Sequence, residues 1–456
     1  MIHGNTAWAA AAMKGRLDGE SLAFEGASTD TRELKPGNLF FCLIGQRDGH
    51  DFAEAAAERG AAALVVDARH AVAAKIPKIV VEDTLQALGD LAQAWRRKFP
   101  IPLLGITGSN GKTTTKELVK CVLQTQYRTL ATEGNFNNLI GVPKTLFGLA
   151  EGDEAAVVEM GMNDFGEIGR LTEIAEPTLG LITNIGQAHL EKLGGLEGVA
   201  RAKGELFAGL KASATALVNA ADPKIAALPT PAQKFCYGKP ECGIWGEVRP
   251  TPSGDARPLH LRIHFEDRSA DLAMQIPGPH NLSNVLAALA VARELKIPFE
   301  NAKAALEAFR PRASRMELLT LAGGIHLIDD CYNANPSSTV AALKTLAGLK
   351  GGQASLAILG EMLELGAFTE EGHREVGRNA AQEGHDRLIA IGPHAQDILA
   401  GAREGGMEEW RMAGFKDPES AIAMLPKVPE GTQWILVKGS RGIHLEKVVA
   451  HLKENF

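Results

Sequence analysis

Residues 103–114 read Leu-Leu-Gly-Ile-Thr-Gly-Ser-Asn-Gly-Lys-Thr-Thr, an apolar run that leads into a glycine-rich turn. The apolar run predicts a buried strand, and the helical pattern from Lys112 to Gln126 predicts that a helix follows the turn directly. The exposed backbone N–H groups of such a turn, aided by the helix dipole, hold phosphate oxygens. The stretch from Gly108 to Thr114 therefore predicts a phosphate-binding loop, in which Lys112 binds the β- and γ-phosphates and the Thr113 hydroxyl binds Mg²⁺.

Further strands and helices alternate around this loop. Apolar runs at Ala155–Met160, Leu179–Asn184 and Ala214–Asn219 are each followed by a helical pattern. Such alternation predicts a parallel, doubly wound sheet. An alternating stretch at His260–Phe265 predicts a short antiparallel addition, and a helix over Asn281–Leu295 closes the block.

Two proline-containing segments, Lys98–Pro102 and Phe309–Arg312, interrupt the helical patterns and predict domain boundaries. We therefore expect an α/β protein of three domains, with a small α/β domain over residues 1–99. A central P-loop-type domain with a mostly parallel sheet occupies residues 100–312. A third, Rossmann-like domain occupies residues 313–456.

The composition is that of an ordinary globular protein, with 45% hydrophobic and 23% charged residues among 456. The formal net charge of -7 argues against nucleic-acid or anionic-membrane binding, which favours basic surfaces. No apolar run reaches about 18 residues, so we expect no membrane span. The five cysteines form no C-x-x-C pair, and we expect reduced thiols and a cytoplasmic protein.

A phosphate loop alone does not separate a GTPase, a kinase and a ligase, so its neighbours matter. Glu159 ends an apolar strand, where a Mg²⁺ ligand of a parallel sheet is expected, although a solvated or capping glutamate has the same pattern. His189 follows the next strand and is either a cation ligand or a satisfied loop histidine. Lys203 lies on a predicted helix, where a solvated lysine is the ordinary interpretation.

Taken together, these motifs resemble those of the Mur ligases, the ATP-dependent amino-acid ligases of peptidoglycan precursor synthesis. The resemblance covers essentially the whole chain. It is carried by the segments Thr107–Thr113, Asn135–Asn138, Gly141–Pro143, Glu159–Gly161, Asn184–His189, Ala202–Glu205, Gly278–Asn281 and Ser314–Glu317.

The resemblance implies that the protein binds ATP and two Mg²⁺ ions. It also implies that Lys203 is carbamylated and that Lys112, His189 and Lys203 have catalytic roles. The implied ATP-binding residues are Gly108, Ser109, Asn110, Gly111, Lys112, Thr113, Thr114, Asn281, Arg315 and Asp330. The implied metal-site residues are Thr113, Glu159, His189 and Lys203. The implied substrate-binding residues are Ser28, Thr31, Arg32, Arg47, Asp48, Gly49, His50, Asn137, Asn138, Asn333, Asn335, Lys438, Ser440 and Arg441.

Within the family, the segment Asp329–Ser338 resembles the signature of the member that joins D-Ala-D-Ala to UDP-N-acetylmuramoyl-tripeptide. Segments Gly360–Gly366 and Val437–Arg441 resemble two more of its motifs, although Glu361 stands where aspartate is more common. The D-N-P-R motif of the member that adds a diamino acid is absent. We expect a monomer with these two substrates. The alternatives are another Mur-type ligase and a nucleotide-dependent switch protein.

Overall fold

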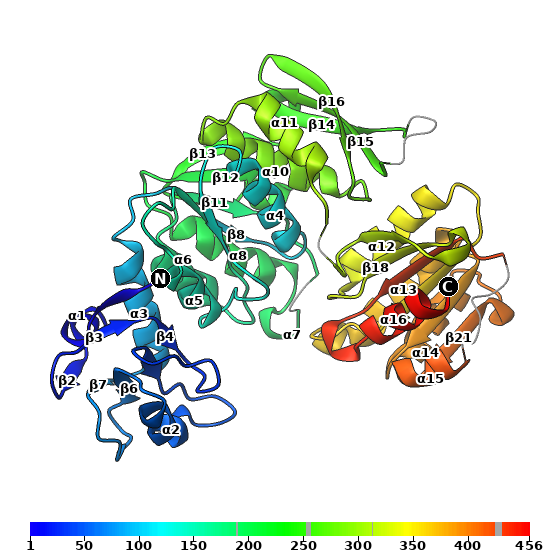
Figure 1. Cartoon of the computed structure of the whole chain (residues 1–456). Coiled ribbons are helices and arrows are strands. Elements are labelled where there is room, and N and C mark those ends of the chain that lie inside the picture. The colour runs from blue at the N-terminus through cyan, green and yellow to red at the C-terminus, as the bar shows by residue number, and fades with distance from the viewer. Residues whose placement is uncertain (188–189, 252–256, 312, 425–430) are drawn as a thin grey trace.

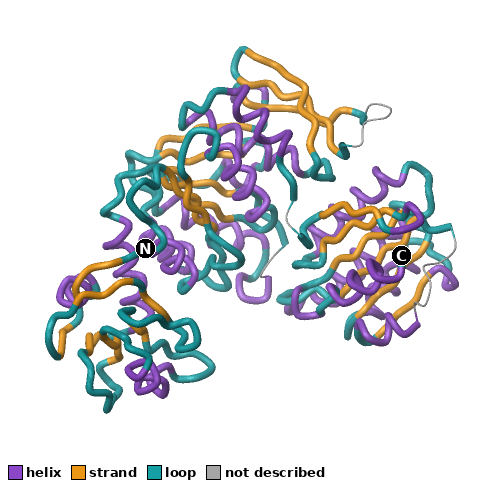
Figure 2. Tube along the Cα trace, viewed as in Figure 1, coloured by secondary structure: helices purple, strands orange, loops and turns teal. Residues whose placement is uncertain are grey.

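The computed structural model describes residues 1–187, 190–251, 257–311, 313–424 and 431–456. Three α/β parts follow one another along the chain, and the central part lies between the other two (Figure 1). Helices and strands alternate through all three, as Figure 2 shows. The predicted α/β fold class is confirmed, and residues 1–99, 100–312 and 313–456 remain our proposed division, because Arg312 lies outside the described residues.

The central part is built on a six-stranded sheet in the order β13-β12-β11-β8-β10-β9, and all its pairings are parallel. Both faces of this sheet are covered, which is why β8, β10 and β11 are buried along their whole length and are apolar except at Thr107 and Glu159, the last residues of β8 and β10. The strands are β8 (Leu103–Thr107), β9 (Thr129–Ala131), β10 (Ala155–Glu159), β11 (Leu179–Ile182), β12 (Thr215–Asn219) and β13 (Gln233–Tyr237).

Helices cover both faces of the central sheet. Residues of α4, α10 and α11 share one apolar core with a separate three-stranded antiparallel sheet, while α5, α6 and α8 contribute to a second core. The predicted antiparallel addition is thus confirmed and extends to three strands. The elements are α4 (Lys112–Leu123), α5 (Gly141–Phe147), α6 (Glu167–Ala175), α7 (Leu190–Leu193), α8 (Leu196–Ala208), α9 (Pro223–Ala226), β14 (Ile244–Arg249), β15 (Leu259–Phe265), β16 (Arg268–Met274), α10 (Asn281–Glu294) and α11 (Phe299–Ala308).

The N-terminal part has a five-stranded sheet, β2-β7-β6-β5-β4, and a two-stranded sheet, β1-β3. Its helix α3 packs against α5 and α6, so its apolar core continues into the central part. The elements are β1 (His3–Asn5), α1 (Thr6–Ala12), β2 (Arg16–Asp18), β3 (Ala23–Glu25), β4 (Ala27–Ser28), β5 (Leu39–Phe41), α2 (Ala53–Glu58), β6 (Ala63–Asp67), β7 (Lys78–Val81) and α3 (Thr84–Arg96).

The C-terminal part has a six-stranded sheet in the order β17-β18-β22-β19-β20-β21, parallel except for β17. Helices lie on both faces, as in Rossmann-type folds. The elements are β17 (Glu317–Thr320), β18 (His326–Asp330), α12 (Pro336–Lys350), β19 (Ser355–Gly360), α13 (Thr369–Gln382), β20 (Arg387–Ile391), α14 (Ala395–Glu404), β21 (Met412–Phe415), α15 (Pro418–Met424), β22 (Trp434–Lys438) and α16 (Glu446–Asn455).

The expectation of reduced thiols is wrong for one pair, because Cys236 and Cys242 form a disulfide. The chain turns back after β13 at Gly238, whose φ is 97°, and a short 3₁₀ helix brings Cys242 beside Cys236, with 5.3 Å between their Cα atoms. The other three cysteines are free. In the part of the chain that the structure describes, no helix is long and apolar enough to cross a membrane.

Candidate active site

The phosphate loop joins β8 to α4 and requires glycine at two positions. Gly108 has φ 149° and Gly111 has φ 77°, a region that side chains disfavour. A Cβ atom at Gly108 would lie 1.9 Å from Oγ1 of Thr183, and one at Gly111 would lie 2.7 Å from Oδ1 of Asn284. Both glycines therefore allow the backbone to approach Thr183 and Asn284 closely, and the predicted approach of the loop to phosphate oxygens stays a prediction.

The end of the neighbouring strand β11 holds this loop in place. Asn184 accepts hydrogen bonds from the backbone N–H groups of Ser109 and Asn110, and its side-chain amide donates to the carbonyl of Asn110 at 3.0 Å. Thr183 donates to the same carbonyl at 2.6 Å. The two residues after β11 thus fix the loop backbone, a role that the sequence analysis did not assign to them.

Lys112 is folded back over the loop. Its Nζ donates to the carbonyl of Gly108 at 2.6 Å and lies 3.4 Å from that of Ser109. Burial lowers the pKa of Lys112, nearby Glu159 opposes this effect, and Arg315 adds to it. The ammonium group is thus hydrogen-bonded to backbone carbonyls. A phosphate could replace these carbonyls without breaking an ion pair of Lys112.

Glu159, at the end of β10, faces the first turn of α4. Its carboxylate accepts hydrogen bonds from Oγ1 of Thr113 at 2.9 Å and from Nδ2 of Asn137 at 3.0 Å. Its side chain is buried, with 2% of the residue exposed. A buried carboxylate beside a hydroxyl is the oxygen-rich ligand set that Mg²⁺ prefers. Predicted metal residues Thr113 and Glu159, together with predicted substrate residue Asn137, therefore form one cluster.

Lys203 lies on α8 and is only 1% exposed. Among the described residues it has no hydrogen bond or ion pair. Burial lowers its pKa well below the ordinary value, and the positive charge of Lys112 lowers it further. An unpaired ammonium is costly in such a place, so the side chain favours the uncharged form. His189, the remaining predicted metal ligand, lies outside the described residues.

The C-terminal part meets the phosphate loop directly. Nδ2 of Asn335 donates to Oδ1 of Asn110 at 2.8 Å, and Nδ2 of Asn110 donates to Oγ of Ser337 at 2.9 Å. Asn335 also caps α12 by accepting the N–H of Ser338 at 2.9 Å, which fixes its orientation. The predicted ATP-binding and substrate-binding segments are therefore in contact, although 225 positions separate Asn110 from Asn335.

Two arginines lie against the ring of Tyr332. The guanidinium of Arg315 is 3.8 Å from the ring centroid and that of Arg441 is 5.5 Å away, within cation–π range. Arg315 also lines a small pocket with Thr113 and Thr114, beside α4. The ring therefore connects a predicted ATP-binding arginine with a predicted substrate-binding arginine. Tyr332 lies within the segment Asp329–Ser338, but the sequence alone assigns it no role.

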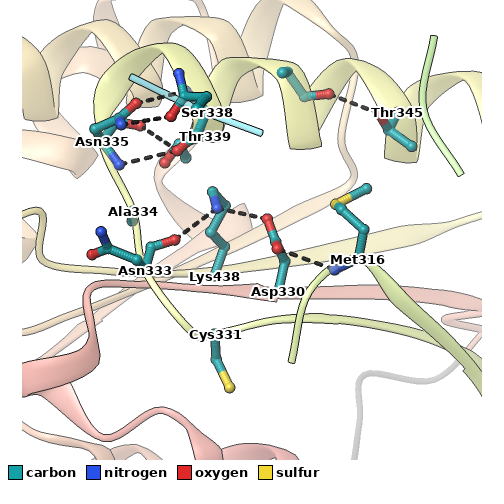
Figure 3. Close-up of polar contacts among 12 residues, drawn as sticks. Met316, Asp330, Cys331, Asn333, Ala334, Asn335, Ser338, Thr339, Thr345 and Lys438 are labelled. Carbon is teal, nitrogen blue, oxygen red and sulfur yellow. Dashed lines mark hydrogen bonds and ion pairs between the residues drawn. The ribbon is translucent and has the colours of Figure 1, made fainter. Parts of the chain in front are cut away.

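Lys438 is paired inside the C-terminal part (Figure 3). Its Nζ donates to Asp330 at 2.6 Å and to the carbonyl of Asn333 at 2.9 Å, with 3% of its side chain exposed. Burial raises the pKa of Asp330, and Lys438 opposes that rise. Ser440 is likewise engaged, because its hydroxyl accepts from the N–H of Leu363 and donates to the carbonyl of Ala334. Of the predicted substrate residues on this segment, Arg441 is the exposed one.

Asn281, at the start of α10, is 1% exposed and points inward. Its Nδ2 donates to the carbonyl of Pro277 at 2.7 Å, and its Oδ1 accepts from Asn284 at 2.8 Å. Asn284 in turn accepts from Oγ1 of Thr115 at 3.1 Å. This network ties α10 to α4 beneath the phosphate loop, and the predicted contact of Asn281 with ATP stays a prediction.

The predicted substrate residues of the N-terminal part form two loops. In one, Ser28 donates to the carbonyl of Asp30, and Arg32 pairs with the Asp30 carboxylate. In the other, the Asp48 carboxylate lies 2.6 Å from Nδ1 of His50 and 3.1 Å from Nε2 of His70, an additional residue that sequence reasoning missed. Thr31, Arg47 and Gly49 lie in the same two loops.

The first of these loops borders the central part. Nζ of Lys144 on α5 lies 3.4 Å from the carboxylate of Glu33, and the side chain of Asn138 accepts the N–H of Gly141, the first residue of that helix, at 2.8 Å. Within the described residues, no hydrogen bond or ion pair joins these N-terminal loops to the phosphate loop. Their place in one substrate site remains a prediction.

Comparison with known proteins identifies the family to which this chain belongs. Models of the Mur ligase middle domain, the Mur ligase glutamate ligase domain and the Mur ligase family catalytic domain match residues 106–292, 314–441 and 24–96. UDP-N-acetylmuramoyl-tripeptide–D-alanyl-D-alanine ligase of Bacillus subtilis is 36% identical over 96% of this chain and 94% of its own length. The chain belongs to the Mur ligase family. The predicted resemblance is therefore confirmed.

Other relatives agree. The Escherichia coli enzyme of the same name is 35% identical, with 97% of each chain covered. Among solved structures, MurF of Acinetobacter baumannii has a TM-score of 0.91 at 29% identity and covers 100% of this chain and 99% of that one. MurF of Thermotoga maritima, solved with ADP, has a TM-score of 0.84 at 26% identity and covers 94% and 97%. The three-part fold of this Mur ligase matches theirs.

Proposed function

We propose that this Mur ligase uses ATP to join D-Ala-D-Ala to UDP-N-acetylmuramoyl-tripeptide, forming a UDP-linked pentapeptide, ADP and phosphate. The names of its full-length relatives support this substrate pair. The observation that carries the proposal is the contact of Asn335 and Ser337 with Asn110. It brings the motif that resembles the D-Ala-D-Ala-adding member to the loop where ATP phosphates would bind.

The nucleotide part of the proposal rests on the phosphate loop. Gly108 and Gly111 permit the strand–turn–helix geometry of an anion-binding loop, and Lys112 can exchange its carbonyl partners for phosphate oxygens. Arg315 lies beside the same helix and supplies a second cation. The solved relative with ADP supports the assignment to an adenine nucleotide.

The residues of this region fit Mg²⁺. Thr113 and Glu159 offer the oxygen ligands, and His189 is a further candidate from the sequence. Lys203 fits a cation site only after modification, because an ammonium repels a metal ion. Its buried amine, which has no partner among the described residues, is suited to react with CO₂, and the carbamate would be an anion beside Lys112. Bound Mg²⁺ would neutralise charge on the transferred phosphoryl group.

In the proposed reaction, the terminal carboxylate of the tripeptide attacks the γ-phosphorus of ATP, and the bond to ADP breaks. Lys112 and Arg315 stabilise the charge on the phosphoryl oxygens. The amine of D-Ala-D-Ala then attacks the acyl carbon, and phosphate leaves. Acyl phosphates hydrolyse readily, so the contact between Asn110 and the C-terminal part helps to close the site against water.

Phosphate release from Mg-ATP tests the proposal. We expect release to require both UDP-N-acetylmuramoyl-tripeptide and D-Ala-D-Ala, with the UDP-linked pentapeptide identified by mass. Release that requires a single amino acid instead would indicate another Mur ligase. Release that neither substrate changes would contradict a ligase function and favour a nucleotide switch. The same assay with lysine-containing and diaminopimelate-containing tripeptides would define the acceptor.

A further inference from the structure

A histidine with a carboxylate on each side lies at the carboxyl edge of the C-terminal sheet. Nδ1 of His394 lies 2.8 Å from Asp397, and its Nε2 lies 3.9 Å from Glu361. Glu361 follows β19 and His394 follows β20, its neighbour in the sheet. Ligands of doubly wound sheets bind at the carboxyl ends of strands. The cluster therefore lies where this part of the molecule is expected to hold a substrate.

A second histidine, His373, packs against the ring of His394. Nε2 of His373 accepts the N–H of Met362 at 2.9 Å, so its proton is on Nδ1, which donates to the carbonyl of Thr369 at 2.6 Å. Burial lowers the pKa of His373, which keeps this ring uncharged. The rings of His373 and His394 stack with 4.9 Å between centroids. His394 is thus held on one face, while 36% of its side chain stays exposed.

A cation lies beside this acidic cluster. The N–H of Ser440, after β22, donates to the carbonyl of Glu361 at 3.0 Å, and the exposed Arg441 is the next residue. A dipeptide carries an ammonium group at one end and a carboxylate at the other. An arginine suits the carboxylate and a glutamate suits the ammonium group. Neighbouring strand ends therefore present charges that complement both ends of a dipeptide.

The same loop reaches the central part. A Cβ atom at Gly366 would lie 2.7 Å from the side chain of Glu191, and the short 3₁₀ helix Gly366–Phe368 packs against α7. Helix α7 directly follows the segment Asn184–His189, whose first residue holds the phosphate loop. The loop that begins at Glu361 thus extends from the cluster around His394 to the central part.

We propose that Glu361 binds the ammonium group of the incoming dipeptide and that His394 is the base that deprotonates it, with Asp397 as the positioning residue. This inference rests on the proposed function. An α-amino group has a pKa of roughly 8, so near neutral pH most of it is protonated and has no lone pair for attack. One proton passes from the nitrogen to Nε2 of His394. Asp397 holds the opposite ring nitrogen and stabilises the imidazolium that forms.

The remaining steps balance the reaction. The freed lone pair forms the C–N bond at the acyl carbon, and the C–O bond to phosphate breaks. The second proton of the nitrogen leaves with phosphate as hydrogen phosphate. His394 returns its proton to solvent, for which its exposed side gives a route.

The test compares two nucleophiles, D-Ala-D-Ala and hydroxylamine, in the His394→Gln variant. The matched control is His326→Gln, because His326 begins β18 and lies where the strands of the same sheet start. Hydroxylamine traps acyl phosphates and is uncharged near neutral pH, so it needs no base to free its lone pair. We expect His394→Gln to lower dipeptide-dependent turnover about 10²–10⁴-fold. Hydroxamate formation from ATP and the tripeptide substrate should persist, and His326→Gln should change neither rate.

Two more variants separate the roles. Glu361→Gln should raise KM for the dipeptide more than it lowers kcat. Asp397→Asn should lower the dipeptide-dependent kcat and leave hydroxamate formation unchanged, because the ring that Asp397 orients is needed only for the dipeptide.

Equal losses with both nucleophiles in His394→Gln, or no loss with either, would overturn the assignment of the base. An unchanged KM in Glu361→Gln would overturn the ammonium site. If the wild type forms hydroxamate but never the pentapeptide, the proposed function fails, and this inference fails with it.

Discussion

Replacing Lys438 by methionine distinguishes a structural lysine from a substrate-binding one. Its ammonium lies 2.6 Å from Asp330, and the two side chains are 3% and 15% exposed. Removing one partner of a buried hydrogen-bonded pair costs about 3–5 kcal/mol, because the other is left unpaired. For a domain of this size, that predicts a decrease in melting temperature of roughly 6–20 °C. Differential scanning calorimetry at neutral pH measures it.

The loss should depend on pH. Burial already holds the pKa of Asp330 above its unfolded value, and without Lys438 it rises further. The folded variant then binds a proton that the unfolded chain does not, so its stability falls as pH rises through the raised pKa. The deficit against wild type should therefore shrink at acidic pH. The double variant Asp330→Asn/Lys438→Met should recover most of the stability, since no unpaired charge remains.

A Lys438→Met protein that melts with the wild type but no longer responds to D-Ala-D-Ala would refute this reasoning. That result would show that the amine is available to substrate, as the sequence analysis predicts, and that the pair with Asp330 contributes little to stability.

Four further changes test the phosphate site. Lys112→Ala should lower ATP-dependent phosphate release at least about 10²–10³-fold without changing the melting temperature, and normal turnover in a folded variant would contradict the loop assignment. Gly108→Ala should lower turnover by about 10²-fold or more, because its methyl group would displace Thr183; kinetics with saturating ATP measure this. Lys203→Ala should lose activity and regain part of it with added acetate, whereas Lys203→Arg should not; equal behaviour of the two would argue against a carbamate. Asn110→Ala removes two bonds to the C-terminal part, and we expect a faster ATPase reaction without dipeptide, measured as uncoupled phosphate release.

Short-range patterns in the sequence determined much of this protein. The β8–turn–α4 unit, the apolar parallel strands and the two essential glycines follow from residue periodicity and from backbone conformations that only glycine adopts readily. The motif segments also indicate the Mur ligase family, which the relatives confirm.

Only the tertiary structure decided which partners these motif residues have. The sequence does not indicate that Lys438 pairs with Asp330 or that Cys236 forms a disulfide with Cys242. Nor does it bring His394 to Glu361. The Lys438–Asp330 and His394–Glu361 pairings depend on which strand ends become neighbours after the chain has crossed over the sheet, whereas Cys242 reaches Cys236 through the turn at Gly238. Side-chain periodicity predicts that a residue faces inward, but burial, charge and hydrogen-bond partners are set by the elements packed against it.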